Sequence, residues 1–249
     1  MSTRIALIGY GKMGKMIASL AAERDCEIVS RIDPQSPDCY REISPQSLAD
    51  AEVCIDFSHP SIVVDNIRKV LALGKPMVVG TTGWHNVHEE IRQLVQEAGT
   101  GLVYGANFSI GMNLFSRVVT EAVKYFDNFD IYDVYGMELH HNQKADSPSG
   151  TAIELAKLII ANSSSKTEAL FDTCKRRIEP QELHFASVRG GSIPGTHTVA
   201  FDSEADSIEL IHRVRSRSCF AYGALQAAQW VKDKPGFHSF AEVISSILC

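Results

Sequence analysis

Residues 4–23 read RIALIGYGKMGKMIASLAAE, and this segment sets the architecture expected of the whole chain. The apolar run from Arg4 to Gly9 is typical of a buried parallel strand. A glycine-rich turn follows it, and the apolar spacing from Lys15 to Glu23 predicts a helix. A strand, a glycine turn and a helix in this order are the context in which such a turn indicates a nucleotide site.

The glycines of the turn, Gly9, Gly11 and Gly14, have the GxGxxG spacing of a Rossmann-type dinucleotide site. The first permits a tight turn, the second lets backbone amides approach a pyrophosphate, and the third permits close helix–strand packing. The helix N-terminus adds unpaired N–H groups and a favourable dipole. The alternative is a glycine turn that binds another ligand or none. The residues expected to contact a dinucleotide here are Gly9, Tyr10, Gly11, Lys12, Met13 and Gly14.

Asp33 ends the next expected strand, roughly 20 residues further on, where a carboxylate can bind ribose hydroxyls. A carboxylate repels a 2′-phosphate, so Asp33 favours NADH over NADPH. Lys12, Arg31 and Arg41 could offset that repulsion and allow NADPH to bind. For Arg31 and Arg41 taken singly, a solvated surface charge is the simpler interpretation.

Strand-like and helix-like segments alternate through the first 108 residues, which predicts an open, mostly parallel α/β sheet. The expected strands are 4–9, 27–33, 52–58, 77–82 and 102–108, and the expected helices are 15–23, 61–73 and 88–98. Ligands of such sheets bind beyond the carboxyl ends of the strands. The small and hydroxyl residues at two of these ends are Gly80, Thr81, Thr82, Gly105, Ala106, Asn107 and Phe108.

We expect these two strand ends to line the nicotinamide half of the cofactor. Asn107 could hold the carboxamide through hydrogen bonds. Ordinary turn chemistry explains the same residues equally well.

The pattern changes after Phe108, where strands follow one another without helices between them. This is typical of an α+β region with an antiparallel or mixed sheet covered on one face. The residues alone leave open whether the last two helices return to the first domain. The expected strands are 131–139, 183–189, 197–201 and 207–214, and the expected helices are 113–126, 151–161, 221–231 and 240–248.

The segment 138–152, ELHHNQKADSPSGTA, places two histidines and a lysine directly before an expected helix. Histidine is well suited to proton donation near neutral pH. Alternation along a strand would point His140 and His141 to opposite sides, so only one would face a substrate unless the strand ends there. Lys144 could hold a carboxylate or act as an acid.

The helix after this segment begins with Thr151-Ala152-Ile153-Glu154, a spacing that predicts Thr151 as its cap. Its first amides, near Gly150 and Thr151, would form an anion site. A metal site of His140, His141 and Asp146 is a poor alternative, because adjacent histidines without a third close ligand make a weak zinc pattern. We therefore expect no metal. A structural hairpin with solvated side chains is the other alternative.

Composition restricts the class of protein. The formal net charge is -6 and the pI about 5.8, which disfavours nucleic acid and anionic membranes as partners. Apolar runs fall short of the about 20 residues of a membrane span, and the start lacks signal-peptide features. The six scattered cysteines suggest reduced thiols. A cytoplasmic protein is expected.

The segment 138–152 closely resembles the E-(x)-HHxxKxDxPSGTA signature of the 4-hydroxy-tetrahydrodipicolinate reductase family, also called the dihydrodipicolinate reductases. GYGKMG at 9–14, VVGTTG at 78–83, GANFSIGMN at 105–113 and SRSCFAYGA at 216–224 agree with that family in order and spacing. The resemblance therefore covers nearly the whole chain. The His-His-Lys motif is specific to the family, whereas many dehydrogenases share the glycine turn.

The resemblance implies a Rossmann-like dinucleotide-binding domain, residues 1–108 and 219–249, and an α+β domain, residues 109–218, with an open mixed sheet. The second domain would bind substrate and build a homotetramer. It also implies NADH- or NADPH-dependent reduction of a cyclic dicarboxylate in the diaminopimelate route to lysine. His140 would be the proton donor and Lys144 its assistant. The substrate carboxylates would contact His141, Gly150 and Thr151.

Two features depart from the family pattern. The segment Pro34–Ser47 is short, which makes cofactor preference harder to infer, and Ser147 stands where alanine is common. Two other functions remain open at this point. One is another Rossmann oxidoreductase, such as an aspartate dehydrogenase-like enzyme, and the other is a non-catalytic NADH-binding protein.

Overall fold

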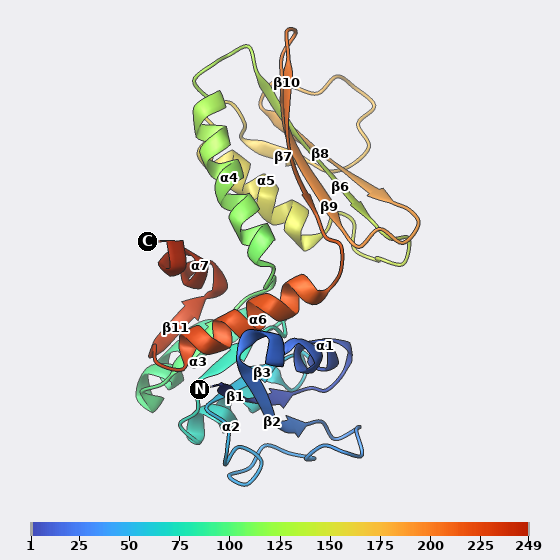
Figure 1. Ribbon diagram of the computed structural model, residues 1–249. Helices are drawn as coiled ribbons and strands as arrows, with labels where there is room; N and C mark the ends of the chain where they lie inside the picture. The colour runs from blue at the N-terminus through green and yellow to red at the C-terminus, as the bar shows by residue number, and fades with distance from the viewer. Residues whose placement is uncertain (1, 249) are drawn as a thin grey trace. The chain divides into compact units, whose positions relative to one another are not determined.

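The computed structural model describes residues 2–248, which form two compact units (Figure 1). Unit 1 comprises Met1–Ile110 and Arg217–Cys249, and unit 2 comprises Gly111–Ser216. The C-terminal segment therefore belongs with the N-terminal one, a point that residue patterns alone left open.

Unit 1 is built on a six-stranded sheet in the order β11-β5-β4-β3-β1-β2, in which every pair of neighbours is parallel. Its strands are β1 (Thr3–Ile8), β2 (Cys26–Ile32), β3 (Val53–Asp56), β4 (Met77–Val79), β5 (Gly101–Tyr104) and β11 (Gly236–Ser239). A parallel sheet needs cover on both faces, and β1 shows how the sequence supplies it. Ile5 and Leu7 enter one apolar cluster, while Ala6 and Ile8 enter the other.

The two clusters correspond to two layers of helices. One cluster takes side chains from α1 (Lys12–Leu20), α6 (Ser218–Val231) and α7 (Phe240–Leu248). The other takes them from α2 (Val63–Ala72) and α3 (His88–Ala98). Short 3-10 turns, η1 (Ala22–Arg24) and η2 (His85–Val87), complete the unit. The predicted α/β class with a Rossmann-like parallel sheet is confirmed.

Strands β3, β4 and β5 end earlier than the sequence predicted, and two further differences concern α1 and β11. Helix α1 begins at Lys12 rather than Lys15, because Gly11 has extended backbone and its carbonyl accepts from the Lys15 amide at 3.0 Å. Strand β11, which was not predicted, pairs with β5 from more than 130 positions away along the chain. Of its four residues, Gly-Phe-His-Ser, Phe237 alone belongs to the types enriched in strands.

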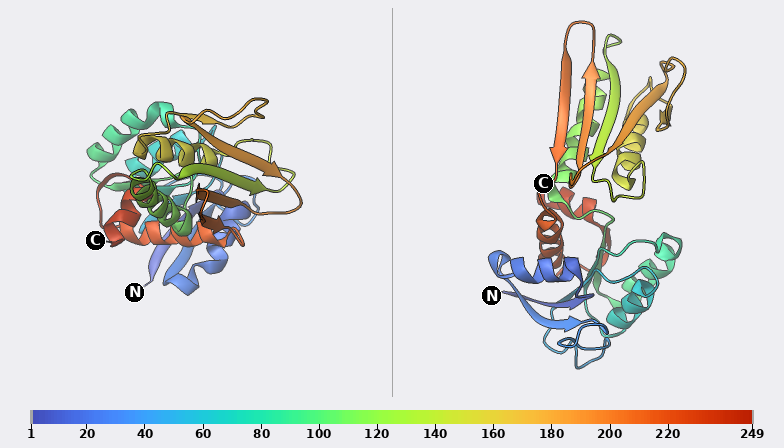
Figure 2. Two further views of the ribbon diagram at one scale, coloured as in Figure 1. Left: turned by 90° about the horizontal axis from the view of Figure 1, so that it is seen from above. Right: turned by 90° about the vertical axis from the view of Figure 1, so that its right-hand side faces the viewer.

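Unit 2 contains a five-stranded mixed sheet in the order β10-β9-β6-β8-β7. Its strands are β6 (Asp133–His140), β7 (Glu168–Leu170), β8 (Glu182–Arg189), β9 (Thr196–Asp202) and β10 (Ser207–Arg213). Helices α4 (Ile110–Phe126) and α5 (Gly150–Asn162) lie together on one side of this sheet (Figures 1 and 2). Their apolar side chains share a core with Leu183, Phe185, Val199 and Phe201 of the sheet. The predicted mixed sheet is confirmed, and the short strand β7 was missed.

Among the described residues, none of the helices combines the length and apolar character needed to span a bilayer. Five cysteines, Cys26, Cys39, Cys54, Cys174 and Cys219, are free thiols. Cys249, which the prediction of reduced thiols also covered, lies outside the described residues.

Candidate functional site

The glycine-rich turn follows β1, and backbone atoms pack closely against two of its glycines. Gly9 has a φ of +87°, and a Cβ at this position would lie 2.5 Å from the carbonyl oxygen of Phe57. A Cβ on Gly14 would lie 2.3 Å from the carbonyl oxygen of Gly9. Both positions therefore require glycine for the turn and for the approach of α1 to β1.

Gly11 differs from these two glycines, because a Cβ built on it meets no atom within 4 Å. It is exposed and directly precedes α1, whose first amides have no intrahelical acceptor. Open space in front of a glycine and a helix N-terminus is what a pyrophosphate needs. Lys12 is exposed beside this space, whereas Met13 packs partly into the core. The turn therefore fits a dinucleotide.

Asp33 lies next to this turn at the carboxyl end of β2. Its Oδ2 accepts a hydrogen bond from the Tyr10 amide at 2.8 Å, and its Oδ1 accepts from the Gln35 amide at 2.9 Å. The carboxylate is thereby fixed against the glycine turn. The Arg31 guanidinium lies 5.1 Å from the centre of the Tyr10 ring, so a positive charge is also near.

The residues after β4 have unequal surroundings. Gly80 makes room for Phe57, because a Cβ there would lie 2.2 Å from its ring. Thr81 is buried and its hydroxyl donates to Asp56 Oδ1 at 2.7 Å, whereas Thr82 is exposed. Thr81 thus has a structural partner that the sequence did not indicate.

Asp56, at the end of β3, is fully buried and organises a polar network that sequence reasoning missed. Its Oδ1 accepts from the Ser58 amide and hydroxyl at 3.0 and 2.8 Å, and its Oδ2 accepts from Asn66 Nδ2 at 2.9 Å. Burial raises the pKa of Asp56, although these hydrogen bonds oppose the rise. The network fixes the loop that packs under Gly9. An aspartate at a strand end followed by a serine two residues later was the available signal.

The segment Gly105–Phe108 follows β5. Asn107 Oδ1 accepts from the Ser109 amide at 2.9 Å, close to the start of α4. The ring of Phe108 is 2% exposed and packs in the core against Phe57 and Phe240, which leaves its backbone for the predicted contact with the cofactor. A small hollow at this sheet edge is lined by Val79, Thr81, Thr82, Trp84, His85, His88, Tyr104, Gly105 and Ala106.

In unit 2, the sheet register assembles a second cluster of polar residues. Alternation along β6 turns Glu138 and His140 to the same face, which carries the helices. Glu138 pairs with Ser187 of β8 and with His197 of β9, and His140 pairs with Arg189 of β8. Residues about 50 positions apart in sequence therefore meet around one carboxylate.

The Glu138 carboxylate is fully buried. Its Oε1 accepts from the Ser149 amide, the Ser187 hydroxyl and Arg189 Nη2, each at 2.8 Å. Its Oε2 lies 2.8 Å from His140 Nδ1 and 3.7 Å from His197 Nε2. Burial alone would raise the pKa of Glu138, but the hydrogen bonds from Ser149, Arg189 and Ser187 lower it to about 2.

Lys144 lies in the loop that follows His140 and is three-quarters buried. Its Nζ contacts both carboxylate oxygens of Asp146, at 2.7 and 2.8 Å. Burial lowers the pKa of His140, and the charges of Lys144 and Arg189 lower it further against the opposing effect of Glu138. The predicted proton donor and lysine thus share one electrostatic environment.

The start of α5 corrects one prediction. Ser149, not Thr151, is the N-cap: it has extended backbone, and its hydroxyl accepts from the Ala152 amide at 3.2 Å. The amide of Ser149 in turn donates to Glu138 Oε1 at 2.8 Å. Gly150 and Thr151 are then the first two residues of the helix, where amides lack intrahelical acceptors. Gly150 is exposed with open space around it, which suits an anion.

His141 lies beyond the end of β6, so strand alternation does not direct its side chain. Of the described residues, only Glu138, His140 and His197 bring three potential metal ligands within 4.8 Å of one another. This set differs from the His140, His141 and Asp146 set considered from the sequence. A cation there would face the Arg189 guanidinium on the same carboxylate, which makes the cluster a poor metal site.

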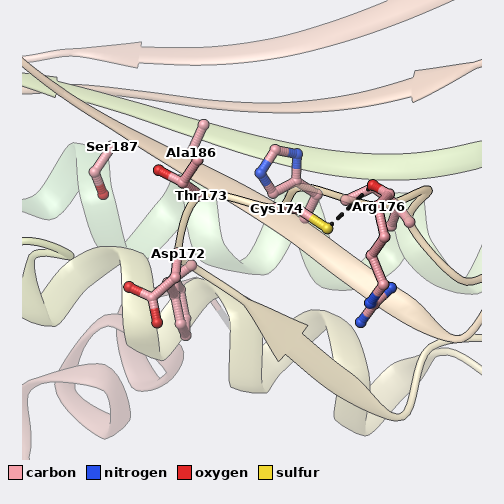
Figure 3. Close-up of a pocket in the computed structure, with 9 residues that line it drawn as sticks. Asp172, Thr173, Cys174, Arg176, Ala186 and Ser187 are labelled. Carbon is pink, nitrogen blue, oxygen red and sulfur yellow. Dashed lines mark hydrogen bonds between the residues drawn. The ribbon is translucent and has the colours of Figure 1, made fainter.

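A larger pocket of about 500 Å³ lies between β8 and the segment that precedes it (Figure 3). It is lined by Phe171, Asp172, Thr173, Cys174, Arg176, Ile178, His184, Ala186 and Ser187. Ser187 and Arg176 lie at opposite ends of the group in Figure 3. Apart from Ser187, which donates to Glu138, this pocket shares no residue with the cluster described above.

Comparison with known proteins places this geometry in context. Residues 3–108 match the family described as dihydrodipicolinate reductase, N-terminus, and residues 111–244 match its C-terminus. The chain is 36% identical to the 4-hydroxy-tetrahydrodipicolinate reductase of Christiangramia forsetii over 98% of both chains. It is 37% identical to that of Zymomonas mobilis, over 98% of this chain and 97% of the relative.

A solved structure has the same fold. It is the dipicolinate-bound dihydrodipicolinate reductase from Paenisporosarcina sp. TG-14, with 24% identity and a TM-score of 0.78, covering 96% of this chain and 98% of that one. The two family matches account for both units, and the full-length relatives carry the same activity. The chain therefore belongs to the dihydrodipicolinate reductase family, the NAD(P)H-dependent 4-hydroxy-tetrahydrodipicolinate reductases of lysine biosynthesis.

Proposed function

We propose that this reductase protonates its substrate from His140, within a site in unit 2 that Lys144 and the N-terminus of α5 complete. The observation that carries the proposal is the meeting of these three features around one end of β6. Family membership favours this activity over an aspartate dehydrogenase-like reaction. A non-catalytic NADH-binding protein would have no need of a proton donor.

The proton donor must be charged when it acts. In the absence of substrate, burial lowers the pKa of His140, so the imidazole is mostly neutral at pH 7. A dicarboxylate brings two negative charges toward it, and a nearby opposite charge favours the protonated imidazole. Substrate binding would therefore charge His140 in the complex in which the proton is needed. Burial, with a smaller effect of Lys144 and Arg189, thus keeps the donor neutral until the substrate carboxylates arrive.

The substrate would be held through its carboxylates. A relative's structure contains dipicolinate, a planar dicarboxylate, which supports a dicarboxylate site in this chain. Lys144 would exchange its Asp146 partner for one substrate carboxylate, and the amides of Gly150 and Thr151 would bind the same group. His141 would contact substrate from the loop beyond β6.

Unit 1 would bind the cofactor through the glycine turn, with Asp33 on the ribose and the ends of β4 and β5 near the nicotinamide. When bound, the nicotinamide supplies the hydride that reduces the substrate. Asp33 is fixed beside the turn by the Tyr10 amide, which supports a preference for NADH. Arg31 and Lys12 would make NADPH usable by attracting its 2′-phosphate.

Unit 2 would also carry the oligomer contact. On the sheet face away from the helices, Leu139 pairs with Val188, and Met137 pairs with Thr198, which in turn pairs with Ile211. Val188 and Ile211 are 44% and 37% exposed. An open apolar face of this kind supports a homotetramer built through the sheet. Cytoplasmic location stays a prediction.

The experiment mixes the purified protein with pyruvate, aspartate semialdehyde and a purified dihydrodipicolinate synthase, and follows oxidation of NADH and of NADPH separately. Oxidation should depend on the synthase and be faster with NADH. Asp33→Asn should lower the ratio of the NADH rate to the NADPH rate, because it removes the charge that repels the 2′-phosphate. Equal ratios in the two proteins would refute the role of Asp33.

A further inference from the structure

We propose that Glu138 is the positioning residue of the proton donor: its carboxylate orients the His140 imidazole so that Nδ1 faces the protein and Nε2 is left for substrate. The inference rests on the proposed role of His140 in substrate protonation. It concerns a residue that carries no chemistry itself and that was not a candidate in the sequence.

The two oxygens of the Glu138 carboxylate have different partners. Oε1 accepts three hydrogen bonds of 2.8 Å, from Ser149, Ser187 and Arg189, which anchor this end of the carboxylate. Oε2 receives no hydrogen bond. It is buried and makes an ion-pair contact of 2.8 Å with His140 Nδ1, which is also buried and has no hydrogen-bond partner. An anchored anion this close to Nδ1 favours a proton on that nitrogen. The neutral imidazole then keeps its lone pair, and the charged imidazole its transferable proton, on Nε2.

The other ring nitrogen of His140, Nε2, lies beside Gly195. A Cβ on Gly195 would lie 3.0 Å from His140 Nε2, and the φ of Gly195 is +152°. Backbone of this conformation is rarely adopted by residues with a side chain. The chain therefore places its smallest residue beside the nitrogen that Glu138 leaves unpaired. A side chain at that position would crowd Nε2.

Glu138 also connects the donor to the proposed carboxylate site. The Ser149 amide that it holds belongs to the N-cap of α5, directly before Gly150 and Thr151. One buried carboxylate thus fixes both the imidazole and the helix end that would bind the substrate. The coupling follows from register, because Glu138, Ser187 and His197 are direct neighbours across three strands.

The charged and titratable groups around His140 come from several elements. Glu138 lies on the same strand, Lys144 and Asp146 in the loop after it, Arg189 on β8 and His197 on β9. The Glu138 carboxylate is in direct contact with the ring, 2.8 Å from its Nδ1. Removing its charge leaves Lys144 and Arg189 to act on the imidazole with less opposition, so the protonated form should be disfavoured.

The test is a nuclear magnetic resonance titration of the His140 ring nitrogens in the ligand-free protein. In Glu138→Gln the amide oxygen can still accept at the Oε1 position, but the charge is lost. We expect the pKa of His140 to fall by about one pH unit or more, and the pH dependence of kcat/KM to move the same way. The control is Glu182→Gln, which removes a buried glutamate of β8 paired with Arg176 rather than with His140. It should leave the titration of His140 unchanged.

An unchanged pKa of His140 in Glu138→Gln, or a loss of activity that is uniform across pH, would overturn the proposal and leave Glu138 a structural residue. Should this variant not fold, the wild-type protein supplies the answer through the tautomer of neutral His140. Nitrogen chemical shifts should show the proton on Nδ1, and a proton on Nε2 would overturn the proposal. The titration and the nitrogen chemical shifts do not depend on turnover, so failure of His140 as proton donor would be seen separately, as an active His140→Gln variant.

Discussion

Gly11 and Gly14 belong to one turn, yet the structure predicts different effects of adding a methyl group to each. A Cβ on Gly11 meets nothing within 4 Å, and its backbone is extended, with φ of -77° and ψ of -151°, outside the left-handed region. Replacing glycine at a compatible position is neutral or stabilises by about 0.4–1 kcal/mol, because the unfolded chain loses freedom. Gly11→Ala should therefore fold as stably as the wild-type protein.

Cofactor binding should respond in the opposite way. The open space at Gly11 is where backbone amides would approach the pyrophosphate. A methyl group there would keep the phosphates away and weaken a charge-assisted hydrogen bond, at a cost of about 2–3 kcal/mol. That cost corresponds to a Kd for NADH raised roughly 30- to 150-fold.

Gly14→Ala supplies the contrast. Its Cβ would lie 2.3 Å from the Gly9 carbonyl oxygen, which must move, and overpacking of this kind costs about 1–3 kcal/mol. Thermal unfolding and NADH titration of the two variants separate the effects: Gly11→Ala should lose binding alone, and Gly14→Ala should lose both. Wild-type affinity for NADH in Gly11→Ala would refute the placement of the cofactor over this turn.

Three further predictions address the polar clusters. Burial lowers the pKa of His197 to about 4, so the folded state prefers the neutral ring. Its contribution to the free energy of unfolding is therefore complete above the unfolded pKa of about 6.5 and is lost as pH falls toward 4. Between pH 7 and pH 5 the free energy of unfolding, measured with urea, should fall by about 2 kcal/mol because of His197. The variant His197→Gln should not show this decrease. Asp56→Ala leaves buried donors of Ser58 and Asn66 without their acceptor. It should lower the free energy of unfolding by about 3 kcal/mol or more and weaken NADH binding. A decrease below about 1 kcal/mol would count against the network. Lys144→Ala should raise KM and lower kcat, each by roughly tenfold, and steady-state kinetics with both parameters unchanged would remove it from the site.

Local features of the chain could be predicted because local chemistry determines them. The glycine turn, the alternation of strands and helices in unit 1 and the helix at 88–98 follow from periodicity and from residues within one turn. Glu138 lies on the expected strand 131–139 and His140 directly after it, so alternation continued by one residue places both on one face, as β6 does. That signal was present and was not used.

Other features depend on segments that are distant in sequence. Arg189 and His197 reach Glu138 only through pairing of β6 with β8 and β9, which no local pattern specifies. Ser149 caps α5 instead of Thr151, and Glu138 accepts from its amide, a tertiary contact that the local sequence does not specify. The ring of Phe108 is buried against Phe240, far along the chain. Site residues chosen by motif alone therefore include some whose side chains stabilise the fold.

The central claim is that His140 delivers the proton, and the most direct measurement compares kcat of the wild-type protein, His140→Gln and His184→Gln in the synthase-coupled assay. His184 is a half-buried histidine of β8 that lies outside the Glu138 cluster and serves as the matched control. The account predicts that His140→Gln lowers kcat about 100-fold or more, while His184→Gln does not. NADH and pyridine-2,6-dicarboxylate should still bind to His140→Gln with Kd values close to those of the wild-type protein. A His140→Gln variant with the kcat of the wild-type protein would contradict the account.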